Sequence, residues 1–208
     1  LLPGFGLIGI GNVIKSSDVI FTFVPTPSLD DGSYDCSLVD AVVCDLIRSP
    51  NLEGKKFIIG CTTNPGFVDK VDQKLEGRGI SVFYSPEFVA QGTIVRDMKN
   101  ADMILCGGRD NEGFELIKEI YLSFMDSQVN FYPMSNTAAE ITKIGINCFL
   151  TYKISYANMM GQILYNSGCG DEIKNILASI GADSRIGSKY LNYGCLLYTS
   201  PSPRDGLL

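Results

Sequence analysis

The stretch that decides the fold is residues 137–166, TAAEITKIGINCFLTYKISYANMMGQILYN. Apolar side chains recur along it at helical spacing, at Ile141, Ile144, Cys148, Tyr152, Tyr156, Met159 and Ile163. This periodicity predicts a long helix with a continuous apolar face, which must be buried. Because the run is longer than an ordinary surface helix, we expect it to form a spine between domains or between subunits.

A second face of this helix carries Lys143, Asn147 and Thr151, which stand one above another at four-residue spacing. A lysine on an otherwise apolar helix costs free energy unless its ammonium reaches water or meets an anion. Two interpretations stay open. Either Lys143 snorkels at the helix edge, or Lys143 and Asn147 face a cleft in which the ammonium meets developing negative charge.

A membrane span is a competing interpretation of the same run. Its polar side chains recur too regularly for lipid, at Thr142, Asn147, Thr151, Ser155, Asn158 and Gln162. We therefore expect no membrane partner.

Composition narrows the function further. The 208 residues can hold one large domain or two small ones, and 45% of them are hydrophobic. The net charge of −6 argues against nucleic acid as a partner. The absence of histidine removes the usual general base and the Ser-His-Asp triad. The seven cysteines form no CxxC pair, so we expect no metal, reduced thiols and a cytoplasmic protein.

The amino-terminal glycines match a dinucleotide fingerprint in the form Gly4-x-Gly6-x-x-Gly9. Such a motif should follow a buried strand and open a helix. Here only Leu-Leu-Pro precedes it, and a new strand is predicted within ten residues. We therefore interpret it as a glycine-rich loop rather than a pyrophosphate cradle.

Strands and helices alternate through the first two thirds of the chain. Short apolar runs predict strands at residues 18–24, 55–61, 80–85, 101–108 and 129–131, and amphipathic runs predict helices at 37–48, 67–77 and 112–125. This alternation predicts an α/β fold with a parallel sheet flanked by helices. After Pro133 only helices are predicted, at 137–166 and 171–181, so we place a domain boundary near residues 133–134.

Five motifs follow one another in a fixed order. They are VPTP at 24–27, CTTNPG at 61–66, SPEFVAQG at 85–92, Ala139-Glu140-x-x-Lys143-x-x-x-Asn147, and RIGSKYL at 185–191. Together they resemble the nucleotide-sugar 6-dehydrogenases of the UDP-glucose/GDP-mannose dehydrogenase family. The resemblance covers residues 16–194 and is specific, because five motifs match in series.

The resemblance implies the domain organisation. Residues 1–133 are expected to be a partial NAD-binding Rossmann domain that lacks its first strands and glycine fingerprint. Residues 134–194 are expected to be an all-helical dimerisation domain that forms a homodimer through residues 137–166. Residues 195–208, CLLYTSPSPRDGLL, look like a translated sequencing adaptor and are expected to be a non-native tail. We therefore expect an internal fragment that is inactive alone, and Cys195 is not taken as the family's nucleophile.

The resemblance also implies the chemistry, which is the oxidation of a primary alcohol to a carboxylate by NAD through a cysteine thioester. Glu87 is then the general acid/base, and Lys143 stabilises the alkoxide and the tetrahedral oxyanion. Asn147 donates a hydrogen bond beside Lys143, and Thr62 orients the water.

Binding residues carry over from the same motifs. The implied NAD contacts are Val24, Pro25, Thr26, Pro27, Cys61, Thr62, Thr63 and Gln91, although many family members have a glutamate at the last position. The implied substrate contacts are Glu87, Phe88, Val89, Ala90, Lys143, Asn147, Arg185, Tyr190, Leu191 and Asn192. A phenylalanine after the glutamate favours glucose or mannose over N-acetylated sugars, so UDP-glucose is the expected substrate.

Two rival functions remain. Enzymes of the 3-hydroxyacid dehydrogenase group also place a Lys-x-x-x-Asn pair on a long helix after a Rossmann domain. The VPTP and SPEF loops favour the nucleotide-sugar enzymes over this group. The second rival is a non-catalytic module that only dimerises.

Overall fold

The computed structural model describes residues 9–89, 94–125 and 129–193. It divides into two compact units, residues 1–143 and 144–208, so the division falls inside the long helix α6 (Asn136–Asn166). The domain boundary that the sequence places at 133–134 stays a prediction, as does the non-native tail. Residues 195–208 lie outside the described ranges.

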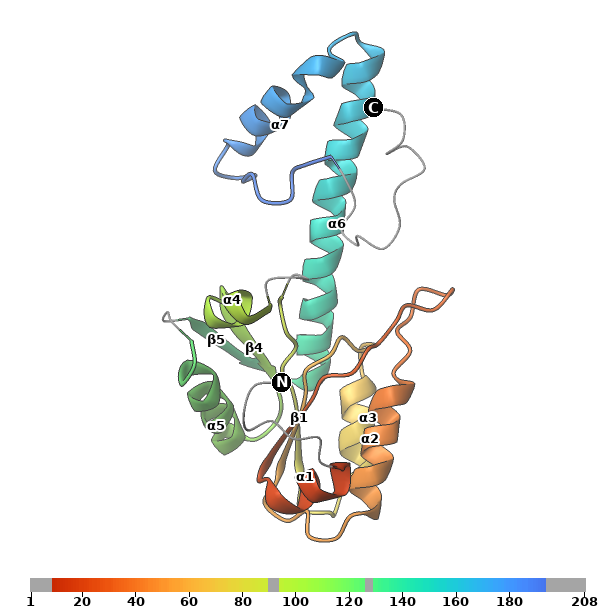
Figure 1. The fold of residues 1–208 in the computed structure, drawn as a ribbon, viewed down its shortest axis with the longest axis vertical. Helices are drawn as coiled ribbons and strands as arrows, with labels where there is room; N and C mark the ends of the chain where they lie inside the picture. Colours follow the sequence, from red (N-terminus) through yellow and green to blue (C-terminus); the bar gives the residue numbers. More distant parts are fainter. Residues whose placement is uncertain (1–8, 90–93, 126–128, 194–208) are drawn as a thin grey trace. The chain divides into compact units, whose positions relative to one another are not determined.

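The first unit is built on a five-stranded sheet with the strand order β1-β2-β3-β4-β5 (Figure 1). The strands are β1 Val19–Thr22, β2 Lys56–Ile59, β3 Ser81–Tyr84, β4 Met103–Gly107 and β5 Asn130–Met134. The helices are α1 Ile10–Ser16, α2 Ser37–Arg48, α3 Phe67–Lys74, α4 Ile94–Lys99 and α5 Asn111–Leu122. The α/β alternation that the sequence predicts is therefore confirmed.

The sheet is parallel within β1-β2-β3 and within β4-β5. The expectation of a parallel sheet fails at one junction, where β3 and β4 pair antiparallel at Tyr84 and Gly107. The connection between these strands contains α4, which has six residues and so spans only about 9 Å. The connection of residues 85–102 is longer than the dozen residues that a parallel crossover needs, so its length alone does not set the direction of β4.

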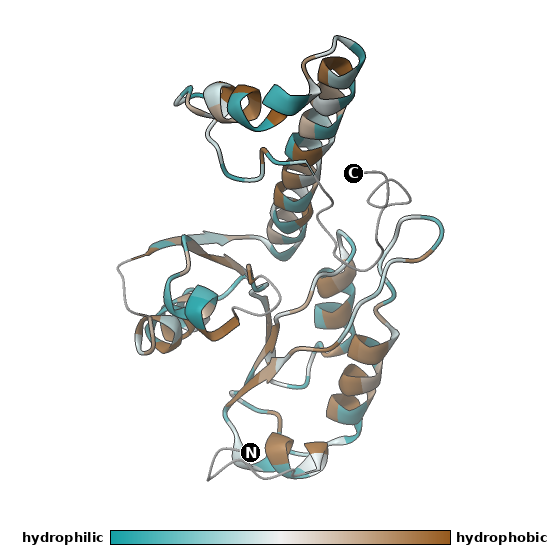
Figure 2. Ribbon diagram, turned by 45° about the horizontal axis from the view of Figure 1, so that its top comes forward, coloured by the Kyte–Doolittle hydropathy of each residue, from teal (hydrophilic) through white to brown (hydrophobic). Residues whose placement is uncertain are grey.

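Side chains alternate between the two faces of the sheet, as strand geometry requires. Phe57 and Ile59 of β2 join the larger core cluster with residues of α2 and α3, whereas Ile58 joins a second cluster with Ile117 of α5. The middle of the sheet is accordingly brown, the colour of apolar residues, in Figure 2. Strands β2 and β3 are buried on both faces, whereas β5 is largely exposed, so the carboxyl edge of the buried strands is left as the place for polar chemistry.

A short helix that the sequence analysis did not predict follows the amino-terminal glycine motif. Helix α1 begins directly after Gly9, and Ile14 anchors it in the core with 1% of its surface exposed. The eight residues between Gly9 and Asp18 leave room for two helical turns before β1. Gly4 and Gly6 lie outside the described ranges, so the interpretation of the whole motif stays a prediction.

The second unit contains the rest of α6, a short 3-10 turn Gly170–Glu172 and helix α7 Ile173–Gly181. Its core is formed by Ala157, Leu177 and Leu191, which pack between α6, α7 and the segment after α7. None of the helices in the described ranges combines the length and the hydropathy that a transmembrane segment requires.

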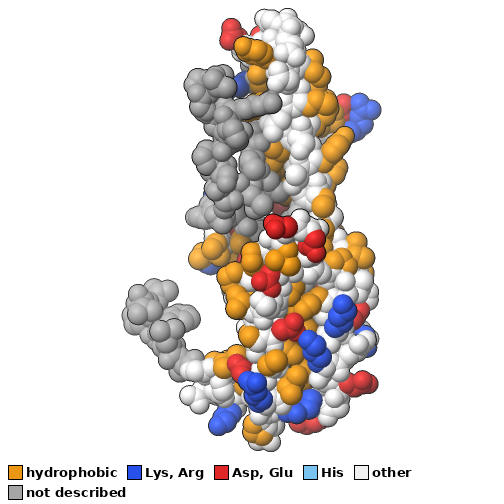
Figure 3. Space-filling model, turned by 90° about the vertical axis from the view of Figure 1, so that its right-hand side faces the viewer, with side chains coloured by type: hydrophobic (Ala, Val, Ile, Leu, Met, Phe, Trp, Pro, Cys, Tyr) orange, Lys and Arg blue, Asp and Glu red, His pale blue; other side chains and the backbone are white. Residues whose placement is uncertain are grey.

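The sequence predicted α6 to within one residue, but its continuous apolar face is not buried within the chain. Ile141, Tyr152, Met159 and Ile163 are 55%, 65%, 51% and 48% exposed. Figure 3 shows hydrophobic side chains at the surface along the part of the molecule that α6 forms. The side of α6 that the second unit does cover carries Ile154, Ala157 and Gly161 instead.

Helix α6 packs closely on the end of β4, and Gly107 makes this approach possible. We expect Gly107→Ala to lower the free energy of unfolding by about 1–3 kcal/mol, since an overpacked contact must be relieved. The added Cβ would lie 2.8 Å from the Asn136 Cα and 3.0 Å from the Ala139 Cβ. Urea denaturation followed by circular dichroism measures the change. Gly11→Ala is the control, because a Cβ there meets nothing within 4 Å. Equal stability of Gly107→Ala and the unmodified chain would contradict the close packing.

Candidate active site

The candidate site lies where β1, β2 and β3 end side by side. Thr22, Ile59 and Tyr84 are register partners across these three parallel strands. The loops that follow them therefore leave from the same edge of the sheet, and they are 24–27, 61–66 and 85–89. Backbone hydrogen bonds tie the loops together, because Gly60 N–H donates to the Thr22 carbonyl (2.9 Å) and Glu87 N–H donates to the Gly60 carbonyl (3.2 Å).

Lys143 enters this edge from the second turn of α6. Its ammonium donates to the backbone carbonyl of Glu87 at 2.6 Å and lies 4.3 Å from the centroid of the Phe88 ring. The residue is only 8% exposed. The ammonium is thus held inside the protein by a carbonyl dipole and an aromatic face, which excludes the snorkelling interpretation.

The surrounding protein moves the pKa values of both ionisable groups toward neutrality, although Lys143 is buried and Glu87 is exposed at the edge of the site. Burial lowers the pKa of Lys143 from 10.5 to about 8, and the carboxyl group of Glu87 partly opposes this shift. Loss of water raises the pKa of Glu87, and the Lys143 ammonium partly offsets the rise. A carboxyl group and an amine with such shifted pKa values in one site are typical of acid/base chemistry.

The loop 61–66 contains two threonines with different environments. Thr63 is fully buried, and its hydroxyl donates to the carboxylate of Glu140 at 2.8 Å. Thr62 is half-buried, and its hydroxyl has no hydrogen-bond partner among the described residues. Cys61 is buried, and burial raises the pKa of its thiol, so it stays a neutral thiol at neutral pH. Thr62 is therefore the side chain of this loop that is available to a ligand.

The loop 24–27 borders the site from β1. Val24 and Thr26 are half-buried, whereas Pro25 and Pro27 are exposed. The Phe23 ring covers Gly60 so closely that a Cβ at Gly60 would lie 2.1 Å from a ring carbon. Glycine at this position lets the first two loops lie against each other.

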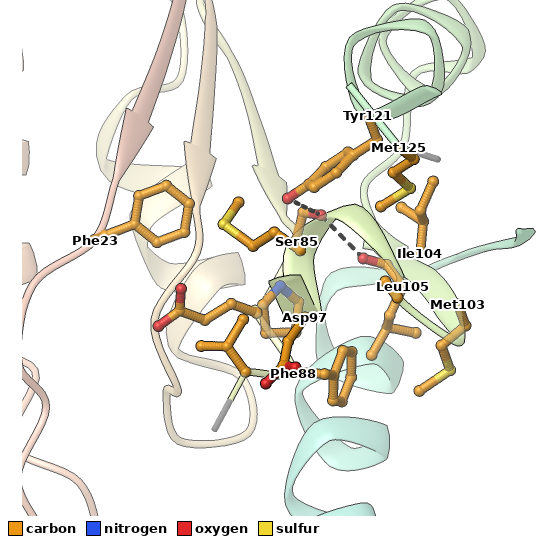
Figure 4. A pocket seen from close by; sticks show the side chains of 14 residues that line it. Phe23, Ser85, Phe88, Asp97, Met103, Ile104, Leu105, Tyr121 and Met125 are labelled. Atoms are coloured by element: carbon orange, nitrogen blue, oxygen red, sulfur yellow. Dashed lines mark hydrogen bonds between the residues drawn. The ribbon is translucent and has the colours of Figure 1, made fainter. Parts of the chain in front are cut away.

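A small pocket opens beside Glu87 (Figure 4). Its volume is about 30 Å³, which is room for about two water molecules. Ser85 lies in its wall, and its hydroxyl forms hydrogen bonds with the Leu105 carbonyl and the Tyr121 hydroxyl, each at 3.1 Å. Phe88 and Val89, for which the sequence predicts substrate contacts, also line the pocket, and their predicted role stays a prediction. The pocket is too small for a sugar, so it does not by itself define the substrate site.

Other predicted site residues belong to the second unit or lie outside the described ranges. Asn147 follows Lys143 on α6 by one turn and is half-buried. Arg185 is exposed and paired with Asp183 at 2.6 Å. Leu191 is a core residue, whereas Tyr190, which has a positive φ of 63°, and Asn192 are exposed. Ala90 and Gln91 lie outside the described ranges, so their predicted roles stay predictions.

One buried acid was not among the predicted site residues. Glu140 is completely buried and accepts three hydrogen bonds from the loop 61–66 and the start of α3. The signal was present in the sequence, because a carboxylate three residues before Lys143 on an apolar helix must find donors. Among the described residues, no cluster of Cys, Asp and Glu is suited to hold a metal ion.

Two family models match the chain. The model of the UDP-glucose/GDP-mannose dehydrogenase family, NAD binding domain, matches residues 8–125, and the model of the same family's central domain matches residues 137–205. The chain belongs to this family.

Individual relatives agree with this assignment. The UDP-glucose 6-dehydrogenase of Rickettsia bellii is 30% identical over 194 residues, which cover 92% of this chain and 44% of that protein. The structure of a UDP-glucose dehydrogenase from Pyrobaculum islandicum matches with a TM-score of 0.79 at 25% identity, over 89% of this chain and 44% of that one. A GDP-mannose dehydrogenase from Pseudomonas aeruginosa matches with a TM-score of 0.74 at 24% identity, over 94% and 47%, which supports the fold alone. The chain thus spans less than half the length of these relatives.

The family assignment makes the first unit an NAD-binding domain. Its described residues fit the cofactor, because the loops 24–27 and 61–63 lie side by side at the carboxyl edge where dinucleotides bind in such sheets. Thr62, whose hydroxyl bonds no group in the part of the chain that the structure describes, and the half-buried Thr26 are the residues whose hydroxyl groups would hold NAD on these loops.

We expect the Lys143 amine to titrate with a pKa of about 8. NMR on protein labelled with ¹³C at lysine Cε follows each amine, and the resonance that is lost in Lys143→Met identifies this one. The unfolded chain holds the extra proton up to the usual value of 10.5, so the contribution of Lys143 to the free energy of unfolding should rise with pH between 8 and 10.5. A midpoint near 10.5 in the folded protein would mean that the amine is solvated, contrary to its burial.

Proposed function

We propose that the protein containing this chain oxidises the C6 primary alcohol of a nucleotide sugar to the carboxylate, with UDP-glucose as substrate. The observation that carries the proposal is the pair formed by Glu87 and Lys143 at the carboxyl edge of an NAD-binding sheet. Both groups have pKa values shifted toward neutrality, and both belong to motifs that the family resemblance marks as catalytic.

NAD, when bound, would accept a hydride from C6, and oxidation of the alcohol to the carboxylate takes two such transfers, to two NAD molecules in turn. Lys143 acts on the oxygen of the same carbon, where its ammonium stabilises negative charge as the alcohol proton leaves and as water adds later. The ammonium has three N–H donors, and the Glu87 carbonyl uses one of them. Among the described residues no other acceptor bonds this ammonium, so two donors are left for substrate oxygens without any loss of the contact that positions Lys143.

Glu87 supplies acid/base catalysis in this scheme. Its carboxylate has no hydrogen-bond partner among the described residues, and its raised pKa brings proton exchange closer to neutral pH. Thr62 stands on the adjacent loop and orients the water that Glu87 deprotonates. The resemblance also implies a cysteine that captures the aldehyde in a motif of the form GGxCFxxD. None of the seven cysteines of this chain lies in such a motif, so that step is not assigned to it.

The choice of UDP-glucose rests on two supports. The sequence has Phe88 after the catalytic glutamate, and relatives from Rickettsia bellii and Pyrobaculum islandicum are named UDP-glucose dehydrogenases. GDP-mannose is the second candidate, since a GDP-mannose dehydrogenase shares the fold. A role as a dimerising module without catalysis is the remaining alternative, and it predicts no turnover of either sugar nucleotide.

The test uses the full-length protein that contains this chain, with NADH formation from UDP-glucose and from GDP-mannose as the readout. We expect Lys143→Ala to lower kcat by about a hundredfold or more with a much smaller change in KM, as for the loss of an oxyanion donor. Lys153→Ala on the same helix is the control, because the Lys153 ammonium bonds only the carbonyls of Ile186 and Gly187 among the described residues.

The same assay tests Glu87. In Glu87→Gln the covalent intermediate should form but hydrolyse slowly, so that a protein-bound thioester accumulates and is visible by mass spectrometry. Near-normal turnover in both Lys143→Ala and Glu87→Gln would refute these roles and leave only the family assignment.

We also propose that the chain forms a homodimer through α6. The exposed apolar face of this helix includes Phe149 and Tyr152, which are 62% and 65% exposed and stack on each other with ring centroids 6.5 Å apart. Such a face on a water-soluble helix calls for a partner, and a second copy of the same helix offers a matching apolar surface.

Sedimentation velocity at micromolar concentration measures this assembly. We expect a dimer for the unmodified chain and a shift toward monomer for Phe149→Glu, because a charge at the centre of the face must be desolvated on pairing. Asn175→Glu, on the exposed side of α7, should leave the dimer intact. A clean monomer of the unmodified chain would count against the proposal.

A further inference from the structure

The residue that most constrains the site without belonging to the proposed chemistry is Glu140. It lies on α6 three residues before Lys143 and has no exposed surface. Its Oε1 accepts from the Thr63 hydroxyl (2.8 Å) and the Val68 N–H (3.0 Å), and its Oε2 accepts from the Gly66 N–H (2.6 Å). All three donors belong to the loop after β2 and to the start of α3.

The Glu140 carboxylate caps the start of α3, which has no side-chain cap of its own. The residue at the N-cap of α3 is Gly66, which has no side chain to cap the helix and has a positive φ of 83°. Glu140 brings an acceptor and a negative charge to the backbone N–H groups of that helix start, where both are favourable. The turn at Gly66 is thereby held in a backbone conformation that few other residues adopt.

The starts of α3 and α6 each supply a carboxylate that accepts hydrogen bonds from the other helix start. Asp69, in the first turn of α3, accepts from the Thr137 hydroxyl at 2.8 Å and from the Asn136 side-chain amide at 3.3 Å. In the opposite direction, the carboxylate of Glu140 in α6 accepts hydrogen bonds from N–H groups at the start of α3. The loop 61–66 is therefore fixed to the same two helical turns that carry Lys143, whose ammonium holds the loop after β3 through the Glu87 carbonyl.

A contribution to the stability of the fold does not by itself explain why the carboxylate of Glu140 is buried here. Burial raises the pKa of Glu140 in spite of its three hydrogen bonds, so the ionised carboxylate still bears a cost of desolvation. Replacing buried ionic groups with uncharged ones is often neutral or stabilising in proteins. The geometry that the carboxylate imposes on the loop is what an uncharged residue would lose.

We propose that Glu140 is a positioning residue, which holds the loop 61–66, and Thr62 within it, in the conformation that receives NAD. The inference rests on the proposed function in one respect, namely that this loop contacts the cofactor. Glu140 touches neither cofactor nor substrate in this scheme and acts only through Thr63, Gly66 and Val68.

Glu140→Gln is the informative variant, tested in the full-length protein. The amide can keep its oxygen at the place of Oε1, but its NH₂ group then faces the Gly66 N–H, and two donors cannot bond each other. We expect amide hydrogen exchange in residues 64–68 to accelerate about tenfold or more, because the local hydrogen bond is lost. We also expect the dissociation constant for NAD to rise about tenfold, which is the size of one lost hydrogen bond of this kind.

Two controls separate positioning from stability. Asp110→Asn makes the same carboxylate-to-amide change at the start of α5, where Asp110 caps the helix through the Glu112 N–H and pairs with Lys56. It should lower the melting temperature without changing NAD affinity. Thr142→Val removes a hydroxyl from α6 that bonds the Ala138 carbonyl and the Met134 sulfur and not the loop 61–66, so the amides of residues 64–68 should stay protected and NAD affinity should stay unchanged.

The inference is overturned if Glu140→Gln lowers the melting temperature as Asp110→Asn does, yet leaves NAD affinity and exchange in residues 64–68 unchanged. Should Glu140→Gln fail to fold, Glu140→Asp gives the same comparison, because it keeps the charge but withdraws the carboxylate by one methylene. If the protein oxidises no nucleotide sugar but the variant still weakens NAD binding, the proposed function fails and the positioning role stands. If oxidation is normal in the variant with unchanged NAD affinity, the positioning role fails alone.

Discussion

The structure of the site depends on two buried charges in the first two turns of α6. Glu140 and Lys143 are both enclosed by the protein, and an unpaired buried charge would cost several kcal/mol. Each therefore has to meet partners from another element. Glu140 meets donors of the loop after β2, and Lys143 meets the backbone carbonyl of Glu87 in the loop after β3. This double requirement ties the start of α6 to the loops after β2 and β3 at the same time.

Close packing makes that docking possible. Gly107, at the end of β4, leaves room for Asn136 and Ala139, so α6 starts directly on the sheet. The antiparallel pairing of β3 with β4 places the end of β4 against Tyr84, the last residue of β3. Because Gly107 is the last residue of β4, this pairing sets the start of α6 beside the loop that follows β3, which contains Glu87.

Desolvation in this site disfavours the charged forms of both Glu87 and Lys143. Desolvation shifts the pKa values of Glu87 and Lys143 toward each other, and their mutual attraction only partly opposes it. Proton exchange near neutral pH is what an acid/base pair needs, whereas a purely structural ion pair would show the opposite shifts. The NAD-binding family to which the chain belongs gives this pair a chemical context.

The sequence by itself determined the α/β alternation, the extent of α6 to within one residue, and the motifs that mark Glu87 and Lys143. Local periodicity and turn residues suffice for these, because they depend on neighbours in the chain. Only the tertiary structure decided that Lys143 is buried and that the apolar face of α6 is left uncovered. It also decided that the hydroxyl of Thr63, and not that of Thr62, bonds Glu140. It also decided the direction of β4. Each of these depends on which distant residues meet, such as Glu140 with Gly66 across 74 positions of sequence, and no local pattern encodes such a meeting.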